Sequence, residues 1–312
     1  MNLWILALIV AGSSAAAVGL MYLVRRHSKS DHFFIEIERG AGIFAFLGTA
    51  FAVILAFVVL AAFQSFNDAK GGAEQEATAV VQLSRTLEFF PADERDPLEG
   101  ALVCYGRAVI DNEWPAMKDG DRGPLVGVWV NRFQGDLKQL KPESEAQKAA
   151  FLQLLGQQDT RTDGRRERLS EANRAIPAPV WFFLVLGAFV SVGFALFFAD
   201  RREGFIVQGS LIAAIAALVV SGLLLVWFLD HPYENHSGSI KPDEMERQVV
   251  VVQREHRHVV PPCNEQGRPV ASPAEASLER LTPGSPLGLL KRGHGEKASP
   301  SDAYESDALL TV

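Results

Sequence analysis

Four long runs without a charged residue divide the chain into apolar segments of membrane-spanning length. One run extends from Gly40 to Asn67, between Arg39 and Asp68. It exceeds the about 20 apolar residues that a helix needs to cross the hydrocarbon core of a bilayer. The other three runs cover residues 1–24, 175–199 and 204–229. This pattern predicts an all-α, polytopic membrane protein with four transmembrane helices that contact the lipid bilayer.

The first run has an alternative interpretation as a cleaved secretion signal. Such a signal carries its basic residues before the apolar core. Here no basic residue precedes the core, and the apolar character continues to Val24, where Arg25 and Arg26 follow. We therefore expect a retained helix over about 3–24 and a second transmembrane helix over about 41–63.

The segments outside the spans differ in composition. Residues 64–178 are predicted to form a helical extramembrane bundle. Only residues 200–203 join the last two spans, which predicts a tight transmembrane hairpin over 179–229. Within the post-membrane segment 230–260, the sequence QVVVVQREHRHVV has the β-branched character of one strand. Residues 261–312 are rich in Pro, Ser, Gly and charge, which predicts a disordered tail.

Apolar positions at three- and four-residue spacing predict an amphipathic helix that continues the second span beyond the membrane. These positions are Ala79, Val80, Leu83, Leu87 and Phe90. The adjacent Gly71 and Gly72 are expected to weaken this helix, and the segment from Pro91 to Pro97 to break it. Further helices are predicted over about 97–114, 125–140 and 143–175.

Basic residues in the short loops predict the orientation, because such loops are enriched in Lys and Arg on the cytoplasmic side. Arg25 and Arg26 open the loop between the first two spans, and Arg201 and Arg202 lie between the last two. Both loops then lie in the cytoplasm, and segment 64–178 and the C-terminus lie on the non-cytoplasmic side of the cell membrane. The basic stretch 161–168 argues for the opposite orientation, but long loops count less in this rule.

Charge and cysteine content narrow the choice of partners and compartments. The net charge of −7 and the lack of a basic patch argue against nucleic acid as a partner. Cys104 and Cys263 could form one disulfide if both face an oxidising compartment. We expect instead that both thiols are unpaired.

Small residues recur at four-residue spacing in the spans, and such stripes let helix backbones approach closely. The longest stripe is Gly209, Ala213, Ala217 and Ser221. Packing within one subunit is the preferred interpretation, and an oligomer interface is the alternative. None of the four runs contains an ionisable residue, which argues against a proton-coupled carrier. A channel and a simple membrane anchor both remain compatible with this pattern.

We predict no catalytic, cofactor-binding or metal-binding site, and hence no enzyme. The histidines and the acidic residues after the last span are expected to be solvated: His231, His236, His256, His258, Asp230, Glu234, Asp243, Glu244 and Glu246. The acidic set lacks the spacing of a calcium loop. Arginines within 161–168 could contact lipid headgroups or pair along their own helix, and Glu74 and Glu76 are further candidate partners.

Several local patterns together resemble the bestrophin-like family of bacterial membrane proteins, a family of unknown function. In order they are LGTAFAVILAFVVLAAFQSF, CYGRAVIDNEWPAM, RRERL, IPAPVWFFLVLGA and LDHPY, spread over residues 41 to about 245. The matching positions are Glu76, Tyr105, Glu113, Trp114, Pro115, Arg165, Arg168, Pro177, Trp181, Asp230 and Pro232. One departure is that ENHS separates Tyr233 from Gly238, whereas the family usually has a glycine soon after this turn.

The family is distantly similar to bestrophins, which are oligomeric anion channels. The resemblance implies a homo-oligomer in the bacterial inner membrane that conducts small inorganic ions passively. The LAFVV sequence is similar to part of a bestrophin pore helix, which puts Thr49, Val53 and Phe57 on one helical face as a candidate apolar constriction. Ordinary packing or lipid contact is the alternative for these three residues.

We predict no cofactor, and we recognise no counterpart of the bestrophin calcium clasp beyond the loose acidic set after Asp230. A second function also fits the residues. In that alternative the protein is a non-conducting, membrane-anchored interaction or scaffold protein, and its extramembrane bundle binds a partner.

Overall fold

The computed structural model describes residues 3–27, 37–172, 175–198, 204–234 and 236–270. Within these ranges the ordered elements are helices and no strand occurs, which confirms the all-α prediction. Four helices are long and apolar enough to cross a membrane, as predicted. They are α1 (Leu3–His27), the first part of α2 (Ile37–Leu87), α7 (Ala178–Leu196) and α8 (Phe205–Asp230).

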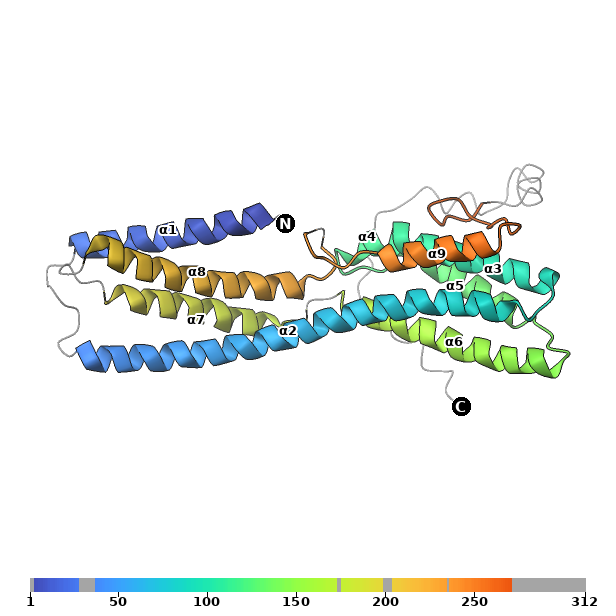
Figure 1. Ribbon diagram of the computed structural model, residues 1–312, viewed down its shortest axis with the longest axis horizontal. Coiled ribbons are helices and arrows are strands. Elements are labelled where there is room, and N and C mark those ends of the chain that lie inside the picture. The colour runs from blue at the N-terminus through green and yellow to red at the C-terminus, as the bar shows by residue number, and fades with distance from the viewer. Residues whose placement is uncertain (1–2, 28–36, 173–174, 199–203, 235, 271–312) are drawn as a thin grey trace, which may run out of the picture. The chain divides into compact units, whose positions relative to one another are not determined.

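The transmembrane helices pack side by side, with α8 between α1 and α7 and with α2 against α7 and α8 (Figure 1). Met21 and Ile212 are buried between α1 and α8. Ala62, Leu184 and Val226 are buried where α2, α7 and α8 meet. Because these contacts are apolar, the helices form one four-helix membrane unit.

Part of the small-residue stripe of α8 packs within the chain. A Cβ added to Gly209 would lie 3.6 Å from Cγ1 of Val18 on α1. The hydroxyl of Ser14 donates a hydrogen bond to the carbonyl oxygen of Ala213 at 3.3 Å. Farther along the stripe, Ser221 is exposed. The first half of the stripe therefore packs against α1 of the same chain.

The second part of α2 enters a helical bundle outside the membrane unit (Figure 1). Its other members are α3 (Ala92–Ala108), a π-helical turn η1 (Val109–Glu113), α4 (Trp114–Met117), α5 (Pro124–Leu137), α6 (Glu145–Ser170) and α9 (Asp243–Glu255). The predicted apolar positions of α2 are all buried in this bundle, including Leu83 and Leu87. The α2 helix is continuous over 51 residues, or about 75 Å.

The predicted break after the long helix is present but lies earlier and is shorter, because α2 ends at Leu87 and α3, which contains Pro97, already begins at Ala92. Pro91 occupies the N-cap position, and the acidic Asp93 and Glu94 in the first turn favour a helix start. Pro97 lies in the second turn, where its missing N–H leaves only the carbonyl of Asp93 without a helical donor. The local cost is therefore small enough for the helix to continue.

The strand suggested for QVVVVQREHRHVV is also wrong, because most of this segment belongs to α9. Met245, Val249 and Val252 recur at helical spacing and are buried against the bundle. This burial outweighs the strand preference of the β-branched residues. The sequence itself contains this helical spacing, because Met245, Val249 and Val252 are four and three residues apart.

The prediction of a disordered tail from residue 261 is wrong for residues 261–269, which are ordered against the bundle. The rest of that prediction, residues 271–312, lies outside the described part of the chain. The indole N–H of Trp129 donates to the carbonyl oxygen of Gly267 at 2.7 Å. Gly267 has φ +72°, and an added Cβ would lie 2.5 Å from the nitrogen of Ala108, so only glycine fits there.

Candidate functional site

The first part of α2 has one exposed and one packed face. Thr49, Val53 and Phe57 are exposed on the described chain, and the Phe57 side chain is 68% exposed. On the opposite face, Phe51 and Leu55 point toward α7 and α8 and are only partly buried. The three predicted constriction residues thus lie together on a face that no described helix of the same chain covers.

Two glycines explain how closely α2 packs against its neighbours. A Cβ added to Gly187 of α7 would lie 2.4 Å from the ring of Phe51, and one added to Gly222 of α8 would lie 2.8 Å from Leu55. Large side chains of α2 therefore fill spaces left by absent side chains on α7 and α8. This fixes the rotation of α2 and with it the direction of Thr49, Val53 and Phe57.

Past the membrane unit, α2 crosses α6 at two glycines. A Cβ on Gly72 would lie 2.9 Å from the carbonyl oxygen of Gly164, and one on Gly164 would lie 2.7 Å from the nitrogen of Glu76. The α2 helix therefore continues through Gly71 and Gly72, which were expected to weaken it, and Gly72 is where it contacts α6. The close crossing brings Glu76 of α2 next to Arg168 of α6.

Glu76 and Arg168 form a fully buried bidentate ion pair. Arg168 Nε lies 2.5 Å from Oε2 of Glu76, and Nη2 lies 3.1 Å from Oε1. The same Nη2 lies 2.6 Å from Oε2 of Glu113. One guanidinium group therefore joins two buried carboxylates, a geometry that the planar donor fork of arginine permits.

Glu113 reaches this pair through the π-helical turn η1. The turn follows directly on α3 and ends at Glu113, and Asn112 within it accepts a hydrogen bond from the nitrogen of Leu125 at the start of α5. Arg165 donates to Glu113 from Nη2 at 2.6 Å and from Nε at 3.2 Å. A π turn changes the direction of the residues that follow it, and such turns recur at functional sites.

Aromatic side chains enclose the charged group. The Tyr105 hydroxyl donates to Oε1 of Glu76 at 2.5 Å. The guanidinium of Arg168 lies 5.2 Å from the ring centre of Trp114, and Trp114 packs edge-on against Tyr233. The Tyr233 hydroxyl donates to the carbonyl oxygen of Ala69 on α2 at 3.0 Å. We call Glu76, Tyr105, Glu113, Trp114, Arg165 and Arg168 the ion-pair network.

The network favours the charged forms of Glu113 and Arg168. Burial acts to raise the pKa of Glu113, but the hydrogen bond from Arg165 and the charge of Arg168 outweigh it and lower the pKa below 4.5. Burial also disfavours the charge on Arg168, yet the neighbouring Glu76 raises its pKa above the ordinary value. Burial and the charge of Glu76 raise the pKa of the Tyr105 phenol. Tyr105 therefore acts as a neutral donor.

Four arginines lie around a cavity beside this network. Arg122, Arg161, Arg165 and Arg166 line a space of about 210 Å³. The guanidinium of the buried Arg161 stacks over the Tyr105 ring at 4.3 Å, and its Nη1 has no hydrogen-bond partner among the described residues. The concentration of guanidinium groups gives this cavity a positive potential.

The arginines of residues 161–168 do not act alike. Arg166 pairs with Asp163 along its own helix at 3.3 Å, which was one of the expected arrangements. Arg168 instead forms its ion pair with Glu76 on α2, one of the two further candidate partners. Glu74 pairs with Lys70 at 3.6 Å. The local sequence does not predict that Arg161 stacks on Tyr105.

A second cluster joins the extramembrane ends of α7 and α8. Asp230 accepts hydrogen bonds from the nitrogen of Ile176 at 2.9 Å and from the indole N–H of Trp181 at 3.1 Å. Pro177 is the N-cap residue of α7. Asp230 is buried, so the expectation that it is solvated is wrong. Asp230 is the last residue of α8, but its carboxylate lies at the start of α7, where the helix dipole favours a negative charge.

Two other motif prolines lie where the course of the chain changes. Pro115 is the second residue of α4, directly after the π-helical turn η1. The carbonyl oxygen of Pro232 accepts a hydrogen bond from the nitrogen of Ile240 at 2.8 Å. Gly238 has φ +93°, so the turn after Tyr233 uses a glycine despite the longer spacing.

Two expectations about isolated residues are wrong. Cys104 and Cys263 form a disulfide that spans 159 residues of sequence. The local sequence gave no means of pairing two cysteines so far apart. His236 and His256 are buried, in contrast to the predicted solvated histidines.

These features define a polytopic α-helical membrane protein with a charged network buried in its extramembrane bundle. The model of the bestrophin-like domain matches residues 11–241. The chain belongs to this bestrophin-like family, as the local patterns predicted. A search of curated proteins gave no match.

Solved structures share the fold at low sequence identity. A mutated form of a bacterial bestrophin homologue from Klebsiella pneumoniae superposes with a TM-score of 0.60 at 14% identity, over 80% of this chain and 98% of that chain. A second mutated form gives a TM-score of 0.59 at 16% identity, over 80% and 97%. A structure described as a membrane protein gives 0.60 at 15% identity, over 80% and 98%.

Proposed function

We propose that this chain assembles into a homo-oligomer in the bacterial inner membrane and conducts small anions passively. Thr49, Val53 and Phe57 of α2 line an apolar constriction of the pore. One helix cannot enclose a pore, so several copies must place α2 around a common axis. The observation that carries this proposal is the uncovered face of α2, whose opposite face is packed against α7 and α8.

Anions are favoured over cations by the arginine-lined cavity in the extramembrane bundle. The four arginines around the cavity beside the network attract anions and raise their local concentration. An apolar constriction without an ionisable group is compatible with passive conduction. Since ion coupling usually uses a charged group at membrane depth, a coupled carrier is not favoured.

The first test is the mass of the purified protein in nanodiscs, corrected for lipid. We expect a closed ring of several copies, and chloride flux into liposomes that contain it. A strict monomer would exclude a pore shared between subunits. A ring that passes neither anions nor cations would favour the non-conducting scaffold, with the extramembrane bundle as the partner-binding part.

The second test substitutes the candidate constriction. Phe57→Ala is expected to change the conductance, because it removes the largest of the three side chains. Phe189→Ala is the matched control, since Phe189 is similarly exposed but lies on α7. Equal currents from wild type and Phe57→Ala would remove α2 as the pore-lining helix.

The proposal also includes an orientation, with the bundle on the non-cytoplasmic side. The Cys104–Cys263 disulfide supports it, because such bonds persist mainly in oxidising compartments. The arginines flanking the two short loops support it as well. A reporter fused after Val312 is expected to give a periplasmic signal, and a cytoplasmic signal would reverse the orientation.

A further inference from the structure

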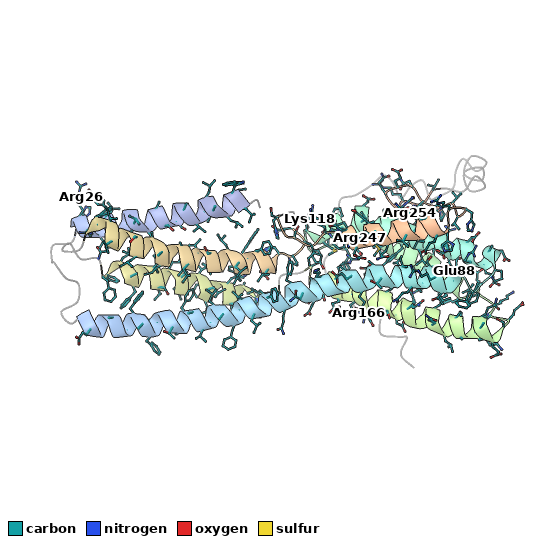
Figure 2. The ribbon with its side chains drawn as sticks, viewed as in Figure 1. Arg26, Glu88, Lys118, Arg166, Arg247 and Arg254 are labelled. Carbon is teal, nitrogen blue, oxygen red and sulfur yellow. A yellow bond between two sulfur atoms is a disulfide. The ribbon has the colours of Figure 1, made fainter. Side chains whose placement is uncertain are left out.

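Three carboxylates surround one buried imidazole where α2, α3 and α9 come together. Glu88 directly follows α2, Glu99 lies on α3, Glu255 is the last residue of α9, and His256 follows it. Figure 2 shows Glu88 at the end of α2, near α9. The group lies apart from the ion-pair network and from the transmembrane helices, so it is independent of the proposed conduction.

The distances from His256 to its neighbouring carboxylates are close to those required around one metal ion. Nε2 of His256 lies 3.4 Å from Oε1 of Glu99 and 3.8 Å from Oε1 of Glu88. The nearest ligand atoms of Glu88, Glu255 and His256 all lie within 4.8 Å of one another. Zinc bonds of 2.0–2.2 Å in a tetrahedron separate the ligand atoms by about 3.4 Å. Small side-chain movements would therefore complete the coordination.

The imidazole has no other partner for the nitrogen that faces the carboxylates. Although His256 is only 7% exposed, its Nε2 makes no hydrogen bond within the described part of the chain. Buried polar atoms nearly always have a partner, so such an atom requires an explanation. A neutral imidazole nitrogen is the commonest protein ligand for zinc. The unpaired nitrogen points to a ligand at this position.

Neighbouring groups hold the carboxylates in place. Ser84 donates a hydrogen bond to the buried Glu99 at 2.8 Å, which orients its carboxylate toward His256. Such support of a ligand by an outer hydrogen bond is typical of metal sites. Glu99 and His256 also line a cavity of about 190 Å³, which leaves room for an ion and a water molecule.

The local charge also favours a cation. Arg85 lies 3.5 Å from Glu255 and offsets part of the negative charge, but its side chain is 63% exposed and can move away. Arg95 is paired with Asp96 at 3.0 Å. Glu88, Glu99 and Glu255 thus bring three carboxylates close to one imidazole, and Arg85 pairs with only one of them.

We propose that Glu88, Glu99, Glu255 and His256 bind a divalent transition-metal cation of the zinc class. The bound ion joins the end of α2 to α3 and to the end of α9. The Cys104–Cys263 disulfide fastens the next part of the same segment to α3. Metal and disulfide together hold residues 256–263 against the bundle.

The test is a titration of the full-length, tag-free protein with zinc chloride, after treatment with chelator and dialysis. We expect one zinc ion per chain by isothermal titration calorimetry and by elemental analysis. His256→Ala is expected to weaken the affinity by at least about tenfold. Glu88→Ala should act in the same direction, and its exposed side chain makes it a variant that folds.

His258→Ala is the matched control, because His258 is exposed and its ring centre lies 6.1 Å from that of His256. This variant is expected to keep the wild-type affinity. The proposal is overturned if the wild-type protein binds no zinc. It is also overturned if His256→Ala and Glu88→Ala both bind zinc as tightly as wild type.

Discussion

Gly72 of α2 and Gly164 of α6 face one another so closely that neither position has room for a methyl group. An added Cβ would lie 2.9 Å from the opposite backbone at Gly72 and 2.7 Å from it at Gly164. The contact sets the distance between the two helices. That distance is what allows Arg168 to reach Glu76 with both ends of its guanidinium fork.

The crossing predicts that Gly72→Ala and Gly164→Ala destabilise the protein by about 1 to 3 kcal/mol through overpacking. Gly71→Ala is the matched control, since nothing lies within 4 Å of an added Cβ there. We expect Gly71→Ala to be neutral or to stabilise α2 by up to about 1 kcal/mol. The measurement is the thermal unfolding midpoint in detergent. Equal midpoints for Gly71→Ala and Gly72→Ala would contradict the close crossing.

Removing one member of the buried ion-pair network is expected to be costly. Arg168→Gln leaves Glu76 and Glu113 without their shared guanidinium, which predicts a loss of about 3 to 5 kcal/mol. Arg166→Gln is the comparison, because its partner Asp163 is exposed, and the loss there should stay below about 1 kcal/mol. A similar loss in both variants would mean that the network contributes no more than a surface pair.

Glu113 predicts a specific acid dependence of stability. Its pKa in the folded protein is lower than the ordinary 4.5. The unfolded chain therefore takes up this proton first as the pH falls. The stabilisation is complete above the unfolded pKa and is lost as the pH falls through the folded pKa. Glu113→Gln should unfold at a lower temperature at pH 7 and should show a flatter decline below about pH 4.5. An unchanged slope in that acid range would contradict this role.

The disulfide predicts sensitivity to reduction. Opening Cys104–Cys263 removes a cross-link between residues 159 positions apart, at an expected cost of about 2 to 5 kcal/mol. Dithiothreitol should lower the unfolding midpoint of wild type and leave that of the Cys104→Ser, Cys263→Ser double variant unchanged. Maleimide labelling should modify neither cysteine before reduction. Labelling of both thiols in the oxidised, folded protein would show that the bond does not form.

The membrane spans could be predicted from the sequence because the absence of charge over 20 or more residues is a local property. The same holds for the buried positions of α2 outside the membrane, which follow helical spacing. The family resemblance also selected Glu76, Glu113, Arg165 and Arg168, but it did not say that they touch. Glu76 and Arg168 are 92 positions apart, and only the glycine crossing of α2 and α6 brings them together.

Other features could not be predicted, because they depend on contacts between segments that are far apart in the sequence. The β-branched residues of α9 favour a strand, and burial of Met245, Val249 and Val252 decides for a helix. The sequence predicts a solvated His256, because nothing near it in the chain indicates that α2 and α3 cover it. Pairing of Cys104 with Cys263 likewise requires the whole bundle to be in place.

The unbroken course of α2 has a mechanical consequence. A continuous helix resists torsion, so a rotation imposed at Glu76 is transmitted along α2 toward Phe57. The two residues lie on one helix, about 28 Å apart along its axis. A ligand that repacks the extramembrane bundle would therefore act directly on the packing of Phe51 and Leu55 against α7 and α8, with no need for a separate linker.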